Sequence, residues 1–479
     1  MPEPVRLMKH SRSARVAAVV AALTMLGPMQ VASADEVAPD PPAPGPATVA
    51  MATTIRVVGR GDARACRGVA GACTLERAAG ARIELRVEPT GALAGRTVRL
   101  ERSWRRPGTS RLTARQSLRR VLGGERLAMQ LPLSLAATQP GLWCVRALVD
   151  ADPSTAAPAA SATPTCVRLR PPIEIGWAGD TVVGSHYGLP PLGGRLQLAG
   201  VHHLLQRPDL MIGNYEGTLS RGGSPRCTGA PPCFIFQAPP ERARNLALAG
   251  FDVMNLANNH GLDMGLGARS QTVAALDRVG IDASGLPGQV TVEQVADTRV
   301  AIVGFSPYPG TTSMRSTSAV RELVQRAARR GDMVVAAFHA GLEGARGAHV
   351  PRGADAGTYT RAAAHAAVDA GADVVFGSGP HVVRGVERYR GAFIVYSSGN
   401  FAGWHNFALG GLASQSGVVR VTFDHTGQAT DAWWDGVVID QPGSPRPDRS
   451  GRVVRHVASL SRADFGSRAA RFARSGRFH

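Results

Sequence analysis

Seven apolar, β-branched runs in the second half of this chain each end in a polar residue that could bind a metal or a phosphate. They cover residues 173–180, 209–216, 251–260, 299–306, 333–339, 373–381 and 392–400. Helix-length stretches separate most of them, and several close on glycine, which tolerates the left-handed conformation at a helix C-terminus. This alternation predicts an α/β domain whose strands end at one crevice. Residues far apart in sequence are therefore expected to converge there.

The chain of 479 residues exceeds the usual size of a single core, so two domains are expected. Residues 1–34 have the basic start, apolar stretch and small-residue end of a signal peptide, with a retained membrane anchor as the alternative. Residues 35–53 are a proline-rich linker, and 54–170 alternate with period two, which is typical of a small all-β, sandwich-like domain. The α/β domain covers 171–440. A basic tail covers 441–479, with a solvated surface helix within 459–478.

The net charge is +18, and 53 of the 54 basic residues are arginine. One interpretation is attraction to an anionic cell-wall or capsule polymer, and the other is the composition bias of the genome. No basic stripe interleaved with aromatic residues is present, so nucleic acid is not an expected partner. Export of the chain to the cell surface or beyond is expected, and membrane contact is expected only if the N-terminal segment is retained.

Six cysteines in an exported chain predict disulfides. Their clustering favours three local bridges, Cys66–Cys73, Cys144–Cys166 and Cys227–Cys233. No pair has the CxxC spacing, so a structural zinc ribbon is not expected.

Carboxylates and imidazoles gather at the predicted strand ends. Asp180 and Glu216 follow the first two strands, and Asn258-Asn259-His260 closes the third, with His339 and His381 after the fifth and sixth. Oxygen and imidazole ligands together suit Zn, Mn or Fe better than Ca or Mg. Five such side chains are expensive to bury unless they share an ion or a substrate. The sequence therefore predicts a site for a metal or an anion.

The motifs of the second half resemble the CapA family of poly-γ-glutamate and capsule synthesis proteins. The matching motifs, in order from 179 to 401, are Gly179-Asp180, Asn214-x-Glu216-Gly217, Leu256-Ala257-Asn258-Asn259-His260, His339-Ala340-Gly341-Leu342-Glu343, Gly379-Pro380-His381 and Tyr396-Ser397-Ser398-Gly399-Asn400-Phe401. That family is similar to the calcineurin-like metallophosphoesterases. The resemblance implies an αββα sandwich with metals held at strand ends.

The resemblance also implies roles for individual residues. The metal ligands are Asp180, Glu216, Asn259, His339 and His381. His260, Asn259 and Glu343 are the catalytic residues, and Asn214, Asn258 and Asn400 bind substrate. Ser378 stands where the family often has histidine, and Thr181-Val182 replace the usual continuation after Asp180. These departures favour one divalent ion, Mn, Zn or Fe, over two.

The function that follows is participation in poly-γ-glutamate or capsule biosynthesis through a metal-dependent hydrolase or transferase site, with a membrane synthase as a further partner. A non-catalytic factor that binds or tethers an anionic polymer is the first alternative, and a generic metallophosphoesterase is the second. Because imidazoles bind metal only when neutral, metal affinity is expected to fall as the pH drops through about 6.5.

Overall fold

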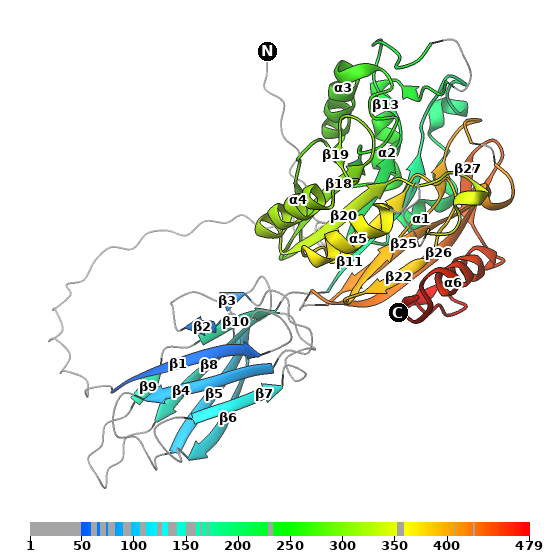
Figure 1. Ribbon diagram of the computed structural model, residues 1–479. Coiled ribbons are helices and arrows are strands. Elements are labelled where there is room, and N and C mark those ends of the chain that lie inside the picture. The colour runs from blue at the N-terminus through cyan, green and yellow to red at the C-terminus, as the bar shows by residue number, and fades with distance from the viewer. Residues whose placement is uncertain are drawn as a thin grey trace, which may run out of the picture. The chain divides into compact units, whose positions relative to one another are not determined.

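A computed structural model describes residues 172–228, 233–351, 359–407, 409–424 and 427–479, and the backbone of ten strands between Val49 and Leu169. The chain divides into two compact units, Met1–Pro171 and Pro172–His479 (Figure 1). The predicted signal peptide lies outside the described residues. Within these residues, no helix combines the length and the apolar character needed to cross a bilayer.

The described elements of the first unit are all strands, as expected for this domain. One set of strands has the order β3-β10-β8-β5-β6 and is antiparallel except for the parallel pair of β3 and β10. Another set has the antiparallel order β2-β1-β4-β7, and the short strand β9 pairs with both β1 and β8. Cys144 and Cys166 are register partners on β8 and β10. The ten strands are β1 (Val49–Val58), β2 (Ala65–Arg67), β3 (Cys73–Thr74), β4 (Arg82–Pro89), β5 (Thr97–Arg105), β6 (Leu112–Val121), β7 (Leu127–Pro132), β8 (Gly141–Val149), β9 (Ala160–Ala162) and β10 (Thr165–Leu169).

The predicted linker over 35–53 is too long at its C-terminal end. Strand β1 begins at Val49 and pairs with β4 from Met51 to Val58. The reason is local, because Val49–Val58 is rich in β-branched residues and has no proline. The proline-rich composition that predicts a linker ends just before this strand.

The second unit contains two large sheets. The first has the order β16-β15-β12-β11-β25-β26-β27, with β24 on β11 and β28 on β26, and its first four strands are parallel. Strand β12 is buried along its whole length, as expected for a parallel strand covered on both faces. The strands are β11 (Ile173–Thr181), β12 (Leu210–Tyr215), β15 (Val253–Asn255), β16 (Asp282–Ser284), β24 (Asn400–Ala402), β25 (Gln415–Phe423), β26 (Ala429–Asp440), β27 (Ser444–Pro447) and β28 (Arg477–Phe478).

The second sheet has the order β17-β18-β20-β21-β23-β22, with β19 on β18, and β18, β20, β21 and β23 run parallel. Its strands are β17 (Thr291–Val295), β18 (Thr298–Ser306), β19 (Thr312–Ser313), β20 (Met333–His339), β21 (Val374–Ser378), β22 (Val386–Tyr389) and β23 (Ala392–Val395). A separate two-stranded pair joins β13 (Thr218–Leu219) to β14 (Gln237–Ala238).

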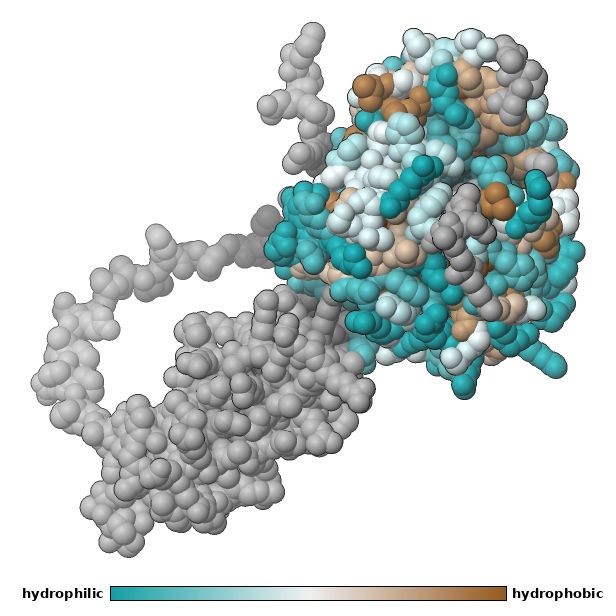
Figure 2. Space-filling view, in the orientation of Figure 1, coloured by the Kyte–Doolittle hydropathy of each residue, from teal (hydrophilic) through white to brown (hydrophobic). Residues whose placement is uncertain are grey.

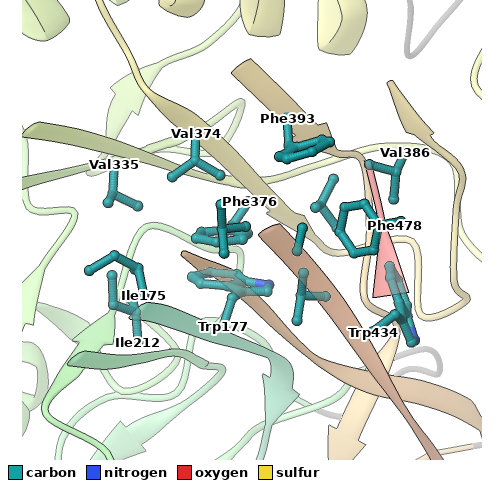
Figure 3. Packing of buried hydrophobic residues seen from close by; sticks show 14 of the residues in the cluster. Ile175, Trp177, Ile212, Val335, Val374, Phe376, Val386, Phe393, Trp434 and Phe478 are labelled. Atoms are coloured by element: carbon teal, nitrogen blue, oxygen red, sulfur yellow. The ribbon is translucent and has the colours of Figure 1, made fainter. Parts of the chain in front are cut away.

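The two sheets pack face to face. Trp177 of β11 and Phe376 of β21 stack with ring centroids 5.6 Å apart, at the centre of a core that both sheets line (Figure 3). Helices α1 (His202–Leu205), α2 (Ala243–Ala249) and α3 (Gly265–Arg278) lie in the chain between strands of the first sheet, and a second core contains residues of all three. Helices α4 (Thr317–Arg330) and α5 (Tyr359–Asp369) share a third core with the second sheet. The αββα order that the resemblance implies is confirmed.

Two predicted runs are not single strands. Strand β15 stops at Asn255, so residues 256–260 form a turn instead of the end of a strand. The run 392–400 divides into β23 of the second sheet and β24 of the first, because the chain turns at Gly399, which has a φ of 75°. The chain therefore passes from one sheet to the other just before Asn400.

The predicted basic tail is wrong, because residues after 440 are part of the fold. Helix α6 (Arg452–Phe465) packs on β22 and β26, and β28 pairs with β26. Its apolar side chains, among them Val453, Val457 and Leu460, belong to the core between the sheets. The composition of this segment predicts solvation, but its apolar residues recur at helical spacing and line one face.

Leu460→Ala should lower the free energy of unfolding by about 2–5 kcal/mol, because it opens a cavity in the core. Ser459→Ala, on the exposed face of the same helix, should change it by less than about 0.5 kcal/mol. Urea denaturation followed by the fluorescence of the buried Trp177 and Trp434 measures both. Equal effects of the two substitutions would mean that α6 is not part of the core.

Candidate metal centre

The predicted site residues converge where the carboxyl ends of both sheets meet. Asp180 lies on β11 and Glu216 directly follows β12, in the first sheet. His260 lies in the turn after β15, while His339 ends β20 and His381 follows β21 in the second sheet. The site is therefore assembled from two sheets, which the sequence pattern of strands alone does not show.

Two buried carboxylates face three imidazoles. Asp180 lies 3.4 Å through Oδ1 from His339 Nδ1, and 3.2 Å through Oδ2 from His381 Nδ1. Glu216 Oε1 lies 3.6 Å from His339 Nε2 and 3.9 Å from both His381 Nε2 and His260 Nε2. One ligand atom each of Asp180, Glu216 and His381 lies within 4.8 Å of the other two. This separation is compatible with a shared ion.

The side chain of Glu216 is buried without hydrogen bonds. Among the described residues, neither of its carboxylate oxygens has a hydrogen-bond partner, and the same holds for the buried Oδ1 of Asn259. Burial of a carboxylate without hydrogen bonds is costly, and a bound cation would remove that cost. Carboxylate and amide oxygens with imidazole nitrogens fit Zn, Mn or Fe. The residues present therefore fit a divalent metal.

Four asparagines form hydrogen bonds around these ligands, two of them directly to a ligand. Asn214 donates from Nδ2 to Asp180 Oδ1 at 2.9 Å, and its Oδ1 accepts from Asn255 at 2.9 Å and Asn258 at 3.3 Å. Asn400 Oδ1 lies 2.9 Å from His381 Nδ1. Substrate binding by Asn214, Asn258 and Asn400 stays a prediction. Their amide groups already bind the ligands or one another, and this supports a positioning role.

The backbone around the site is closely packed. A Cβ on Gly179 would lie 2.0 Å from the carbonyl oxygen of Gly399, so only glycine fits before Asp180. His381 has a φ of 58°, a left-handed conformation that is uncommon for residues other than glycine. Asn400 Nδ2 donates to the carbonyl oxygen of His381 and so helps to hold this conformation.

Ser378 stands where the resemblance leads one to expect histidine. Its Oγ lies 3.1 Å from His339 Nδ1 and donates to the carbonyl oxygen of Phe338. Ser378 thus contacts the Nδ1 side of His339, whereas the Nε2 side of that ring faces Glu216. This contact orients His339 and supplies no imidazole to a second ion.

Asp263 is a site residue that the sequence analysis missed. Its Oδ2 lies 2.7 Å from His260 Nδ1 and accepts from the backbone N–H of Phe236, and Arg226 pairs with its Oδ1. An ionised carboxylate only accepts, so Nδ1 of His260 carries the proton and Nε2 points toward Glu216. The sequence feature that could have identified Asp263 is its position three residues after His260, within one turn.

A disulfide closes the segment that contacts His260. Cys227 and Cys233 are bonded, which confirms this one of the three expected bridges, and the side chains of the other two pairs lie outside the described residues. Phe236 stacks on His260 with ring centroids 4.0 Å apart. Residues on both sides of the bridge, Arg226 and Phe236, therefore contact the His260–Asp263 pair.

Glu343 lies outside the group of contacting residues. It is exposed, and within the described residues no hydrogen bond or ion pair joins it to the ligands. Its charge acts through space on His381 and on Tyr308, whose ring lies 6.2 Å from that of His339. Burial, and then the charge of Glu343, raises the pKa of Tyr308 to about 12. Tyr308, a neutral hydroxyl near the centre, is a second residue that the sequence analysis missed.

The charges of the centre are strongly coupled. Burial disfavours the Asp180 carboxylate, but His339 and His381 outweigh it and hold the pKa of Asp180 well below its usual range. Burial and the charge of Asp180 both raise the pKa of Glu216. Burial also opposes the charged form of His381, but Glu216 and Asp180 outweigh it and raise the pKa of His381 to about 10. In the absence of metal, a proton on His381 therefore compensates the carboxylates.

Metal uptake should release about one proton per ion from His381, and the affinity for Mn should rise about ten-fold per pH unit between about 7 and 9. The sign follows from the raised pKa, because His381 is protonated throughout this interval and must lose its proton to bind. The competition between the proton and the metal for His381 thus extends above the pH of about 6.5 that the sequence leads one to expect. Calorimetric titration in buffers of different ionisation enthalpy measures the proton, with His203→Gln as an exposed control. A flat affinity over this interval would contradict the assignment of His381.

Asp263→Asn should shift the proton of His260 from Nδ1 toward Nε2, because the amide can donate to Nδ1 where the carboxylate only accepted. The ¹⁵N chemical shifts of labelled histidine, assigned with His260→Ala, report the tautomer. Asp277→Asn, an exposed change on α3, should leave the shifts of His260 unchanged. An unaltered His260 spectrum in Asp263→Asn would exclude the positioning role.

Comparison with known proteins places this site within a described family. The sequence model for "Bacterial capsule synthesis protein PGA_cap" matches residues 174–403. The chain is 28% identical over 309 residues to the capsule biosynthesis protein CapA of Bacillus anthracis, covering 58% of this chain and 71% of that one. It is 26% identical over 224 residues to the PGA biosynthesis protein CapA of Bacillus subtilis (strain 168), covering 43% and 56%.

Two solved structures have weaker likeness. A putative 5'-nucleotidase from Staphylococcus aureus is 16% identical at a TM-score of 0.31, covering 57% of this chain and 53% of that one. A purple acid phosphatase from yellow lupin seeds is 9% identical at a TM-score of 0.29, covering 74% and 70%. The family assignment rests on the sequence match over residues 174–403.

Proposed function

The chain belongs to the bacterial capsule synthesis protein family through residues 174–403, and from this premise we propose that it takes part in making poly-γ-glutamate or a related anionic capsule polymer. The names of the two CapA relatives support this biological role. Export to the cell surface, an anionic polymer as partner and a membrane synthase as a second partner are parts of the same proposal.

The chemistry that we propose is metal-dependent hydrolysis or group transfer. The observation that carries it is the buried Glu216 carboxylate, which has no hydrogen-bond partner in the part of the chain that the structure describes and faces three imidazoles within 3.9 Å. Asp180, Glu216, His339 and His381, with the amide oxygen of Asn259, would hold the ion. A bound divalent ion would supply positive charge that activates a water and stabilises an oxyanion.

His260 is the residue placed to move a proton. Asp263 fixes the proton on Nδ1, so Nε2 is left to face the centre, 3.9 Å from Glu216. Phe236 covers one face of the ring and limits the access of water. In cleavage of an amide in the polymer, the leaving nitrogen needs a proton, and a protonated His260 could donate it from Nε2. Tyr308, which keeps its proton up to a pH of about 12, can donate a hydrogen bond to a substrate oxygen.

Glu216→Gln should abolish metal binding, because it removes the charge of the carboxylate that lacks any other partner. The full chain, purified without chelator, should contain Mn, Zn or Fe by elemental analysis. Glu322→Gln, an exposed change on α4, should keep it. His260→Ala should retain the metal and slow turnover of a γ-linked glutamate polymer by about 10²–10⁴-fold.

The remaining outcomes separate the alternatives. Metal without polymer turnover, but with release of phosphate from simple esters, would favour a generic phosphoesterase. Polymer binding that survives both Glu216→Gln and removal of metal, with no turnover at any stage, would favour a non-catalytic binding factor. No metal in the wild-type chain would reject the proposed chemistry.

A further inference from the structure

The positive charge of the second unit is confined to its last segment. Residues 172–448 contain 22 arginines and 23 acidic residues, whereas residues 449–479 contain eight arginines and one aspartate. A composition bias of the genome acts on both segments alike, so it does not explain this asymmetry. That single aspartate, Asp464, is buried and binds His349 and the backbone of Val350.

Helix α6 presents three of these arginines on one side. Arg452, Arg455 and Arg462 lie within an arc of about 80° on the helix, over a length of roughly 15 Å. All three are exposed, whereas the opposite face is buried in the core between the sheets. In Figure 2 the surface in the region where Figure 1 places α6 is largely hydrophilic. Its packing on β22 and β26 fixes the direction of the charged face.

Most of these guanidinium groups have no carboxylate partner. Arg468 pairs with Glu387 and Arg477 with Asp431. The other six are exposed and form no ion pair with any described residue: Arg449, Arg452, Arg455, Arg462, Arg471 and Arg474. The three of them that lie on one side of α6, Arg452, Arg455 and Arg462, are called the arginine face. Arg455 donates to the carbonyl oxygen of Ser450, and the charge of Arg452 acts on Asp448 without an ion-pair contact. Exposed guanidinium groups without an ion-pair partner are available to bind carboxylates in bidentate geometry.

We propose that the arginine face binds a linear polycarboxylate. Repeating carboxylates match the row of guanidinium groups, and each contact would be exposed and weak, so affinity would come from their number. The naming of that polymer as a γ-linked glutamate chain rests on the proposed function. The charge and the exposure of the arginine face do not depend on which polycarboxylate it binds. The arginine face would hold a long polymer on the protein while the metal centre acts on one bond of that polymer.

The packing of α6 argues for a soluble polymer and against a membrane. An interfacial helix binds a bilayer by inserting its apolar face. Here Val453, Val454, Val457 and Leu460 are already buried against the sheets, and the exposed face carries arginine, serine and alanine. Aromatic rings for stacking bases are also absent from the exposed positions of α6, which disfavours single-stranded nucleic acid.

The test compares two triple variants of the full chain. Arg452→Ser, Arg455→Ser and Arg462→Ser remove three charges from α6. Arg321→Ser, Arg329→Ser and Arg330→Ser remove three exposed charges from α4, a helix of the same length. Fluorescence anisotropy with a labelled γ-linked glutamate oligomer should show roughly ten-fold weaker binding for the α6 variant and little change for the α4 variant. The difference should shrink at high ionic strength.

Several results would overturn the proposal: no binding by the wild-type chain, equal losses in the two variants, or tighter binding of a polyphosphate of matched charge. Glu216→Gln should keep wild-type binding of the oligomer, so failure of the metal centre and failure of the arginine face can be told apart. Turnover of the polymer with unchanged affinity in the α6 variant would leave the proposed function intact and reject this surface. Circular dichroism of both variants checks that α6 is folded.

Discussion

Two carboxylates buried together, Asp180 and Glu216, are the constraint on which the rest of this domain depends. Like charges in a dry interior repel one another and are poorly solvated, so the protein must surround them with positive or donor groups. Imidazoles from the opposite sheet supply the positive groups, and Asn214 supplies the donor to Asp180. Glycines at 179 and 399 allow the two chain segments to approach closely enough. The local sequence around the site follows from this electrostatic requirement.

The same requirement explains how the two sheets are held in register at one end. Away from the site, Trp177 and Phe376 stack between them and supply apolar contact, which has little directional preference. At the site, hydrogen bonds and charges fix which residues face each other. The crossing from β23 to β24 brings Asn400 from one sheet onto a ligand of the other. Apolar packing thus holds the two sheets together, and the polar cluster determines how they are aligned.

The site residues that could be predicted from the sequence are those whose position depends on strand periodicity alone. Asp180, Glu216, His339 and His381 stand at or next to strand ends, and the structure brings them together. The sequence analysis missed Asp263, because its role depends on the turn that returns it toward His260. It also misjudged the segment of α6, where the arginine content masked an apolar face that only the sheets could cover. Both failures concern contacts made in three dimensions after the strands are placed.

The division of the ligands between two sheets couples the centre to the folding of the whole domain. Neither sheet alone could bind the ion well, so ion binding would select the state in which the sheets are docked. By mass action, the resulting gain in unfolding free energy would grow with the logarithm of free metal concentration. The metal supply of the surroundings would then set how long the domain survives proteolysis. The bound ion would thus join the two sheets, and the metal concentration outside the protein would set how strongly they are joined.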